Sequence, residues 1–327
     1  MTFWRNKTVL VAGGAGFVGC HLVQELLRAG GKVHVVDNFS TGQAGPLKAL
    51  DQDNLTVQQL DISRPAILPQ ADIVFNLASP ASPIHYQSDP IQTWKTNILG
   101  TLQLFEHAHA CNATLVQAST SEVYGDPLSH PQKETDWGHV NPIGPRACYD
   151  ESKRAAETLL MDAARTSDAD VRIARIFNTY GPGMTTSDGR AIPNFVAQAK
   201  AGNTLTVHGD GTQTRSFCYV SDTVDGLLHL GSLPVAKGEI FNIGNPVENT
   251  ILDIARHVIA IFGDGNDIVF EDRPVDDPQR RRPDIKKAEI LLQWTPKVAL
   301  KEGLMTLSKS QRQGKTKATR THTSNAK

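Results

Sequence analysis

Residues 8–19 read Thr8-Val9-Leu10-Val11-Ala12-Gly13-Gly14-Ala15-Gly16-Phe17-Val18-Gly19, and this stretch decides the fold. A short β-branched and aliphatic run passes directly into glycines spaced Gly-x-x-Gly-x-x-Gly, at Gly13, Gly16 and Gly19. An amphipathic helical pattern over residues 17–29 follows at once. Glycines between a strand and a helix let the backbone approach a pyrophosphate, which the N–H groups and the positive dipole end of the helix attract. The stretch therefore predicts a dinucleotide-binding strand, loop and helix.

The next predicted strand, residues 32–37, ends in the carboxylate of Asp37. A carboxylate at this place accepts hydrogen bonds from the ribose hydroxyls of adenosine and repels a 2′-phosphate, which favours NAD over NADP. An ordinary strand-end aspartate beside a structural turn is the alternative. Asp61 ends the third predicted strand and, with Ile62, is expected to flank the adenine.

Outward from this unit, strands alternate with helical patterns through the first half of the chain. Such alternation predicts an α/β fold, a Rossmann-type doubly wound parallel sheet with helices on both faces. The second half has Pro and Gly clusters around short helices, and we expect it to form a smaller lobe over the carboxyl edge of the sheet, where open α/β sheets bind ligands. The predicted strands are residues 8–12, 32–37, 55–61, 72–78, 114–120 and 171–177, and the principal helices are 17–29, 89–111 and 149–166.

These patterns divide the chain into three parts. We expect residues 1–178 to form the NAD-binding domain and residues 179–307 to form mainly the substrate-binding lobe, with a segment near 216–245 returning to the first sheet. Residues 308–327 are basic and lack an apolar period, which predicts a disordered tail.

Composition excludes several classes of protein. The chain has 327 residues and a net charge of −1, unlike strongly basic nucleic-acid binders. No apolar run reaches the ~18 residues of a membrane span, and no signal-peptide core follows the polar start, so we expect a cytoplasmic protein without membrane or nucleic-acid partners. The cysteines have neither disulfide-framework nor zinc-ligand spacing, which predicts reduced thiols and no metal site: Cys20, Cys111, Cys148 and Cys218.

Tyr149 and Lys153 form a Tyr-x-x-x-Lys pair at the start of a helical pattern. Residues four apart share a helix face, and a nearby ammonium lowers the pKa of a phenol, so Tyr149 is expected to act as a base. Any helix can carry Tyr and Lys four apart, and such a pair alone is more often a solvated helix face. A second signal is the hydroxyl-rich end of the fifth strand, Ser119-Thr120-Ser121-Glu122, where a hydroxyl can bind a reacting sugar oxygen.

These motifs, taken with longer stretches, resemble the extended short-chain dehydrogenase/reductases that modify nucleotide sugars, and within them the UDP-glucuronate decarboxylases, also called UDP-xylose synthases. The resemblance covers residues 8 to about 305. Small departures are Cys20 for the usual Ser, Ser152 for the usual Gly and Arg282 for the usual Lys. The matching stretches are Leu77-Ala-Ser-Pro-Ala-Ser-Pro83, Ala118-Ser-Thr-Ser-Glu-Val-Tyr-Gly125, Asn141-Pro-Ile-Gly-Pro-Arg-Ala-Cys-Tyr-Asp150, Arg175-Ile-Phe-Asn-Thr-Tyr-Gly-Pro182, Gly209-Asp-Gly-Thr-Gln-Thr-Arg-Ser-Phe217 and Asp276-Asp-Pro-Gln-Arg-Arg-Arg-Pro283.

The resemblance implies a redox-neutral decarboxylation of UDP-glucuronate to UDP-xylose. Tyr149 would take the proton of the 4-hydroxyl while the hydride passes to NAD, and Thr120 would bond the same oxygen. The resulting β-keto acid loses carbon dioxide, and carbon 5 is then protonated through Glu122, Arg281 or water, between which the sequence does not choose. The implied catalytic residues are Tyr149, Lys153, Thr120, Glu122, Ser121 and Arg281.

The resemblance also implies the binding residues and a homodimer that pairs helices 89–111 and 149–166. Arg215 and Asn178 are expected to contact the substrate diphosphate, with Arg190 and Lys95 as weaker candidates. The implied cofactor-binding residues are Gly13, Gly16, Phe17, Val18, Gly19, Asp37, Asn38, Phe39, Thr41, Gly42, Asp61, Ile62, Leu77, Ser79, Thr96, Ser119, Tyr149 and Lys153.

Two other readings stay open. A dTDP-glucose 4,6-dehydratase or a nucleotide-sugar 4-epimerase shares the fold, although a dehydratase carries Asp-Glu where this chain has Ser121-Glu122. A non-catalytic NAD-sensing protein on the same fold commonly lacks the Tyr or the Lys, and both are present here.

Overall fold

A computed structural model of the chain describes residues 2–185, 189–273 and 279–309. Its centre is a seven-stranded sheet in the order β11-β6-β5-β4-β1-β2-β3, and every neighbouring pair in it is parallel. The strands are β1 (Thr8–Ala12), β2 (Lys32–Asp37), β3 (Leu55–Gln59), β4 (Ile73–Asn76), β5 (Thr114–Thr120), β6 (Val171–Ile176) and β11 (Ile240–Ile243).

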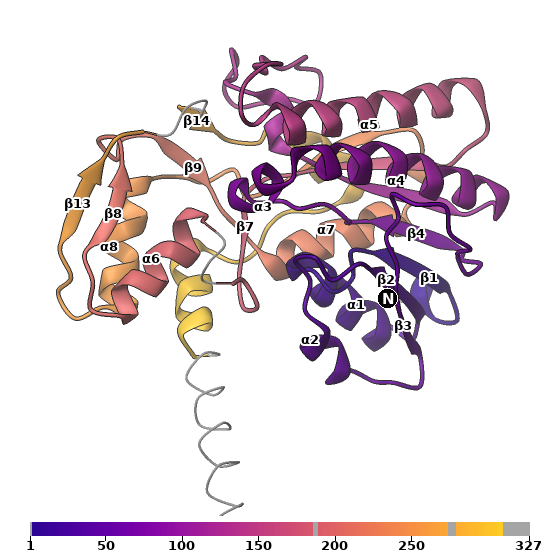
Figure 1. Ribbon diagram of the computed structural model, residues 1–327, viewed down its shortest axis with the longest axis horizontal. Coiled ribbons are helices and arrows are strands. Elements are labelled where there is room, and N and C mark those ends of the chain that lie inside the picture. The colour runs from indigo at the N-terminus through magenta and orange to yellow at the C-terminus, as the bar shows by residue number, and fades with distance from the viewer. Residues whose placement is uncertain (1, 186–188, 274–278, 310–327) are drawn as a thin grey trace, which may run out of the picture.

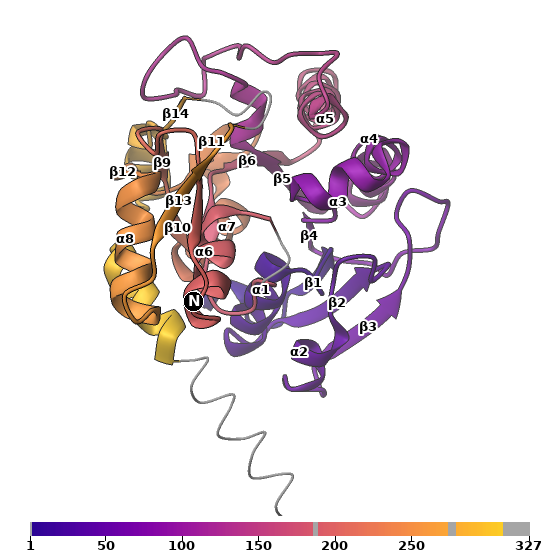
Figure 2. The same ribbon diagram turned by 60° about the vertical axis from the view of Figure 1, so that its left-hand side comes forward.

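Helices cover both faces of this sheet (Figures 1 and 2). On one face, α1 (Phe17–Arg28) packs beside α7 (Val220–Ser232); on the other, α4 (Pro90–Ala110) packs beside α5 (Ala147–Thr166). Successive residues of β1 serve the two faces in turn, because Val9 and Val11 belong to one buried cluster and Leu10 and Ala12 to the other. The predicted doubly wound parallel sheet is therefore confirmed.

The C-terminal part forms smaller sheets beside the carboxyl edge of the large one (Figure 1). In it β8 (Leu205–His208) pairs with β13 (Ile268–Glu271), β10 (Cys218–Tyr219) pairs with β7 (Thr179–Tyr180), and α6 (Ala191–Lys200) packs on α8 (Ile251–Phe262). A third sheet has the order β12-β9-β14, from β12 (Glu248–Thr250), β9 (Thr214–Ser216) and β14 (Arg280–Arg281). The shorter elements are α2 (Ala44–Lys48), α3 (Pro83–Ser88), η1 (Thr2–Trp4), η2 (Ser121–Tyr124), η3 (Pro234–Ala236) and η4 (Ala288–Leu292).

Residues 216–245 belong to the second half of the chain, but part of this segment packs with the large sheet of the first half. This stretch contains α7, which packs on the large sheet, and β11, its edge strand beyond β6. The division into residues 1–178 and 179–307 stays a prediction. Residues 300–309 are helical, and the remainder of the predicted tail, like residues 274–278 within the Asp-Pro-Gln-Arg stretch, lies outside the described residues.

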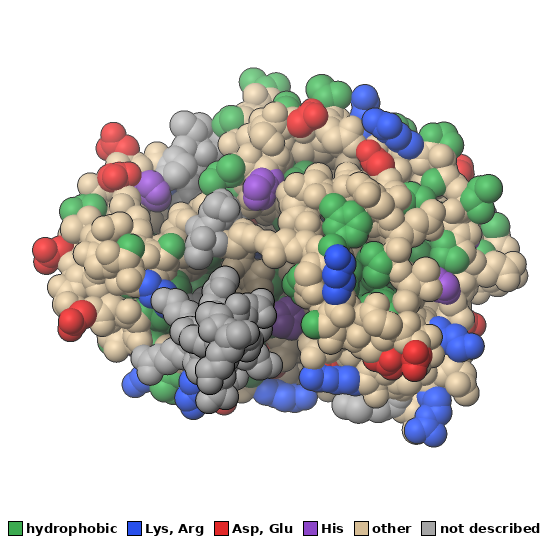
Figure 3. Space-filling model, turned by 60° about the horizontal axis from the view of Figure 1, so that its bottom comes forward, with side chains coloured by type: hydrophobic (Ala, Val, Ile, Leu, Met, Phe, Trp, Pro, Cys, Tyr) green, Lys and Arg blue, Asp and Glu red, His purple; other side chains and the backbone are tan. Residues whose placement is uncertain are grey.

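Three strands are shorter than the sequence predicts. β3 ends at Gln59, β4 covers only Ile73–Asn76, and β6 ends at Ile176. After β3 and β4 the chain lines the first pocket, with residues 60–62 and 77–80. Among the helices that the structure describes, none has the length and apolar character needed to cross a membrane. Both basic and acidic side chains lie around the margin of the face shown in Figure 3.

Candidate active site

The glycine loop closes tightly between β1 and α1. Gly13 has φ +77°, and a Cβ there would lie 2.6 Å from the backbone nitrogen of Ala78. A Cβ on Gly19 would lie 2.2 Å from the carbonyl oxygen of Gly13, so the first turn of α1 can approach the loop only without a side chain. The loop thus brings the N-terminus of α1 to the carboxyl end of β1, the geometry that suits a pyrophosphate.

Asp37 lies at the end of β2, buried beside this loop. Its carboxylate accepts hydrogen bonds from the backbone N–H of Ala15 (2.9 Å) and of Phe39 (2.8 Å). Burial raises the pKa of Asp37, and these two hydrogen bonds oppose that shift. Phe39 has φ +58°, a conformation that the bond from its N–H to Asp37 helps to hold. Asp37 therefore shapes the loop as well as facing the pocket.

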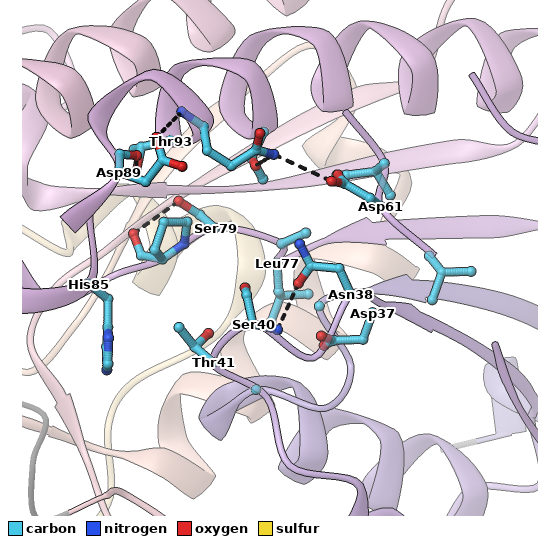
Figure 4. Close-up of a pocket in the computed structure, with 18 of the residues that line it drawn as sticks. Asp37, Asn38, Ser40, Thr41, Asp61, Leu77, Ser79, His85, Asp89 and Thr93 are labelled. Atoms are coloured by element: carbon cyan, nitrogen blue, oxygen red, sulfur yellow. Dashed lines mark hydrogen bonds between the residues drawn. The ribbon is translucent and has the colours of Figure 1, made fainter. Parts of the chain in front are cut away.

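Two adjoining pockets follow the carboxyl edge of the sheet and share lining residues that include Gly13, Gly16 and Thr41. Figure 4 shows the first pocket between the loop after β2, which carries Asp37 to Thr41, and the start of α4, which carries Thr93. Of the predicted cofactor residues, those lining the first pocket are Gly13, Gly16, Asp37, Asn38, Thr41, Asp61, Ile62, Leu77, Ser79 and Thr96, while Phe17, Val18 and Gly19 line the second.

The other predicted cofactor residues do not line these two pockets. Phe39 and Gly42 lie against Asp37, because the N–H of Phe39 bonds it and a Cβ on Gly42 would lie 3.0 Å from its Oδ1. Ser119 is turned away, since its hydroxyl donates to Glu157 Oε1 at 2.5 Å. The residues present fit a dinucleotide such as NAD, because the loop excludes side chains and a carboxylate stands at the end of β2.

Sequence reasoning missed the polar start of α4. The side chain of Asp89 caps this helix through the N–H of Gln92 (3.0 Å), and Asp89, Gln92, Thr93 and His85 all line the first pocket. The Asp-Pro pair at 89–90 is a helix-start signal. This signal predicts where the helix begins, but it does not indicate that the start of the helix faces the pocket.

Tyr149 and Thr120 meet at the end of β5. Burial raises the pKa of Tyr149, and the hydrogen bond with Thr120 opposes the shift, as does the charge of Arg190. Lys153 Nζ lies 5.9 Å from the centre of the Tyr149 ring and donates to the carbonyl of Ala118 at 2.9 Å. Burial lowers the pKa of Lys153 to about 8, and Glu157 opposes this.

The expected lowering of the Tyr149 pKa by Lys153 stays a prediction, and in the chain alone burial raises that pKa. Lys153 is anchored to Ala118, and burial of the phenol outweighs the groups that favour its ionised form. The chain's own groups hold Tyr149 protonated near neutral pH.

Glu122 joins two arginines beside Tyr149. Its carboxylate accepts hydrogen bonds from both terminal nitrogens of Arg281, one of them at 2.8 Å. It also accepts a hydrogen bond from Nη2 of Arg146 at 2.6 Å. Burial would raise the pKa of Glu122, but the charges of Arg281 and Arg146 lower it to about 2. The residues that follow Arg281 are bound to Gln132: Arg282 N donates to Gln132 Oε1 at 2.7 Å and Asp284 N donates to Gln132 O at 2.8 Å. Ser121, the first residue of η2, is buried next to this cluster.

The predicted substrate residues fall into three groups. Arg190 lines the second pocket, and its charge acts on Tyr149. Arg215 is buried on β9 directly opposite Arg281 of β14, and it donates to the carbonyl of Thr214 at 2.9 Å. Asn178 is half-buried, and its carbonyl accepts from the N–H of Cys218, whereas Lys95 is exposed on α4 and lines neither pocket.

The four cysteines are unpaired. Within residues 2–185, 189–273 and 279–309, no group of three or more His, Cys, Asp and Glu side chains is arranged to hold a metal ion.

Comparison with known proteins places this chain in a family. Residues 9–244 match the NAD dependent epimerase/dehydratase family. UDP-glucuronic acid decarboxylase 4 of Arabidopsis thaliana is 51% identical over 309 residues, covering 93% of this chain and 68% of that protein. UDP-glucuronic acid decarboxylase 1 of Xenopus tropicalis is 50% identical over 300 residues, covering 91% and 70%.

Solved structures agree in fold. UDP-glucose 4-epimerase of Thermotoga maritima superposes with a TM-score of 0.84 at 28% identity, covering 94% of this chain and 99% of that one. dTDP-glucose 4,6-dehydratase of Streptomyces venezuelae, solved with NAD, has a TM-score of 0.84 at 27% identity, covering 94% and 97%. The chain therefore belongs to the NAD dependent epimerase/dehydratase family and groups within it with the UDP-glucuronic acid decarboxylases.

Proposed function

We propose that this protein decarboxylates UDP-glucuronate to UDP-xylose, with NAD as a bound cofactor and no net redox change. One observation carries the proposal: the Tyr149–Thr120 pair lies beside a carboxylate held between Arg146 and Arg281. A base next to surplus positive charge suits a sugar that carries both a hydroxyl to oxidise and a carboxylate to lose. The similarity to UDP-glucuronic acid decarboxylases at about half identity supports it.

NAD would be held by the glycine loop at its pyrophosphate and by Asp37 at its adenosine ribose, with Asp61 and Ile62 near the adenine. When bound, it supplies the reversible hydride acceptor for carbon 4 of the sugar. The contacts of Asp37 with Ala15 and Phe39 keep its carboxylate at the pocket rim, so the same group would shape the loop and discriminate against a 2′-phosphate.

Tyr149 takes the proton of the 4-hydroxyl, and Thr120 holds the same oxygen by a hydrogen bond. The free chain keeps Tyr149 protonated, so its action as a base depends on positive charge brought by the bound cofactor and by Arg190. Lys153, fixed to Ala118 with a pKa near 8, is placed to hold charge behind the ring.

Once carbon 4 is a ketone, the carboxyl group on carbon 5 is β to a carbonyl. The bond from carbon 5 to the carboxyl carbon breaks, carbon dioxide leaves, and the electron pair passes into an enolate. Carbon 5 then takes up a proton. Carbon 4 regains the hydride and its oxygen regains the proton from Tyr149, which would give UDP-xylose with no net redox change. Glu122 is bound by two arginines and has a pKa of about 2, so it is a poor proton donor near neutral pH. We assign the donor to water held at this cluster, with Ser121 and Arg281 orienting the ring.

The substrate diphosphate requires donors at the mouth of the site. Arg190 has the strongest support, because it lines the second pocket and acts on Tyr149. Arg215 and Asn178 remain proposed contacts on the lobe side, and exposure gives Lys95 the weakest support.

The test is incubation of the purified protein with a panel of nucleotide sugars, read by mass spectrometry. Loss of one carbon dioxide from UDP-glucuronate supports the proposal. Loss of water from a dTDP- or UDP-hexose would indicate a dehydratase, a change of sugar configuration at constant mass would indicate an epimerase, and binding without turnover would indicate an NAD-sensing protein.

We also propose a homodimer built on α4 and α5, which lie side by side on the outside of the sheet (Figure 1). α4 exposes large apolar side chains at Ile91, Trp94, Leu99 and Leu102. Leu102→Asp should shift the mass measured by light scattering from dimer to monomer. Leu128→Asp, an equally apolar exposed position outside these helices, should not, and a wild-type monomer would contradict the proposal.

The unpaired state of all four cysteines supports a cytoplasmic location, which we propose as well. Detection of the protein in a fraction other than the cytosol after cell fractionation would contradict it.

A further inference from the structure

A cluster of four ionisable side chains lies beside Tyr149, and its charges do not balance. Glu122, Arg146, Asp150 and Arg281 have side chains that are at most 15% exposed. Glu122 supplies one negative charge between the two positive charges of the arginines. The remaining balance depends on Asp150.

Asp150 does not neutralise the surplus near neutral pH. Burial raises its pKa to about 8, the charge of Glu122 adds to the shift, and the charges of Arg146 and Arg281 oppose it. The contact between the two groups is long, because Arg146 Nε lies 3.9 Å from Asp150 Oδ2, an ion-pair separation without a hydrogen bond. The cluster therefore keeps one unbalanced positive charge.

Unpartnered polar atoms mark the same place. Asp150 Oδ1, the hydroxyl of Tyr86 and Arg281 Nε are buried without a hydrogen-bond partner. The Tyr86 ring stacks on the Tyr149 ring with centroids 5.0 Å apart and planes 9° apart, and its hydroxyl group feels the charges of Arg146, Glu122 and Asp150. Buried polar atoms and a buried surplus charge are costly unless a partner satisfies them. The Tyr86 hydroxyl and Arg281 Nε are donors, so with the surplus positive charge they suit an anion with acceptor oxygens.

We propose that Arg146 is a specificity-determining residue that joins Arg281 in receiving the substrate carboxylate, and that Asp150 is a positioning residue that keeps the charge of Arg146 available by remaining uncharged. The proposal rests on the proposed function for the identity of the substrate. It explains why a second arginine lies on Glu122, whose carboxylate already takes both terminal nitrogens of Arg281.

The first test compares a ligand with a carboxylate and one without. The NAD-loaded Tyr149→Phe variant, which should turn over at least about 100-fold more slowly, is titrated with UDP-glucuronate and with UDP-xylose by calorimetry. Adding Arg146→Gln should weaken the binding of UDP-glucuronate by about 10- to 100-fold, the range expected for loss of a charged hydrogen bond. The affinity for UDP-xylose should stay unchanged. Arg146→Lys, which keeps the charge, should recover part of the loss. Equal weakening of both ligands, or of neither, would overturn the proposal.

The second test uses pH. Asp150 faces Glu122 of η2, Arg281 of β14, Tyr86 of α3, and Arg146 and Glu151 at the start of α5. Since Asp150 loses its proton above about pH 8, the affinity for UDP-glucuronate relative to UDP-xylose should fall there. Asp150→Asn should abolish that fall, and the neighbouring Glu151→Gln should preserve it.

Persistence of the fall in Asp150→Asn would contradict the role of Asp150. Because these are binding measurements, a protein that binds both sugars as described without decarboxylating either would refute the proposed function and leave this inference standing.

Discussion

At the scale of single residues, Tyr149 carries most of the proposed chemistry. Tyr149→Phe keeps the ring that stacks on Tyr86 but removes the proton acceptor. Decarboxylation should fall by about 10²- to 10⁴-fold, the usual cost of losing a general base, with NAD affinity retained. Steady-state kinetics and a cofactor titration measure the two effects. Tyr180→Phe, the same change at a buried tyrosine bonded to Leu300, is the matched control, and near-normal activity in Tyr149→Phe would refute the mechanism.

Asp37 holds the loop through Ala15 and Phe39 and is proposed to select NAD, so its substitution should have two effects. Asp37→Asn keeps the shape but removes the negative charge that repels a 2′-phosphate, so the preference for NAD over NADP should narrow. Asp37→Ala should also weaken the binding of both NAD and NADP, because the N–H groups of Ala15 and Phe39 lose their hydrogen-bond acceptor. Fluorescence titration with each cofactor gives the ratio of the NAD and NADP dissociation constants. An unchanged ratio in both variants would mean that another residue selects the cofactor.

At the scale of elements, the glycine loop and α1 form one unit. Gly19→Ala would place a methyl group 2.2 Å from the Gly13 carbonyl oxygen, so α1 must move away from the loop. We expect loss of NAD binding and a lower melting temperature. Gly45→Ala, within α2 and without any atom within 4 Å of the added methyl, should be neutral or slightly stabilising. Equal behaviour of the two variants would contradict the close packing of this loop.

The elements of the first half could be predicted because each has a local signal. β1, β2, β5 and β6 are aliphatic and β-branched runs, and they lie where the sequence predicts them. The ends of β3 and β4 were misjudged, because Leu60, Leu77 and Ala78 keep the apolar character of a strand while lining the pocket.

The acid–arginine cluster could be predicted only in part. Glu122 and Arg281 are 159 positions apart, and only the resemblance suggested that both serve the site. Arg146 and Asp150 carry no local sign of their contacts, since these depend on how η2 and β14 meet at the start of α5. Likewise, nothing near Lys153 shows that it would bond Ala118.

At the scale of the whole molecule, the pair of Glu122 and Arg281 ties the C-terminal lobe to the large sheet. The pKa of Glu122 in the folded protein lies below the ordinary value of 4.5. The ion pair therefore stabilises the fold fully above about pH 4.5, and this stabilisation is lost as the pH falls toward 2. Glu122→Gln should cost about 3 kcal/mol at pH 7, since it leaves two buried arginines without their partner. The difference from wild type in urea unfolding should shrink below pH 4.5, and a constant difference would refute this linkage.

The glycine loop and Asp37 lie on the large sheet, whereas Arg281 and Arg215 lie on β14 and β9 of the C-terminal lobe, and Arg281 meets Glu122 of η2. An intermediate ketone would thus be kept in place until carbon 5 is protonated and carbon 4 is reduced again. The central claim is that decarboxylation is complete within one closed cycle.

The most direct test is to give the purified, NAD-loaded protein UDP-glucuronate in deuterated water and to follow products by NMR. The account predicts carbon dioxide and UDP-xylose in near-equal amounts, with little reduced cofactor released. It also predicts solvent deuterium at carbon 5, because that proton comes from the medium, and none at carbon 4, which regains the hydrogen that it gave up. Stoichiometric accumulation of reduced cofactor with a free 4-keto pentose, or deuterium at carbon 4, would contradict it.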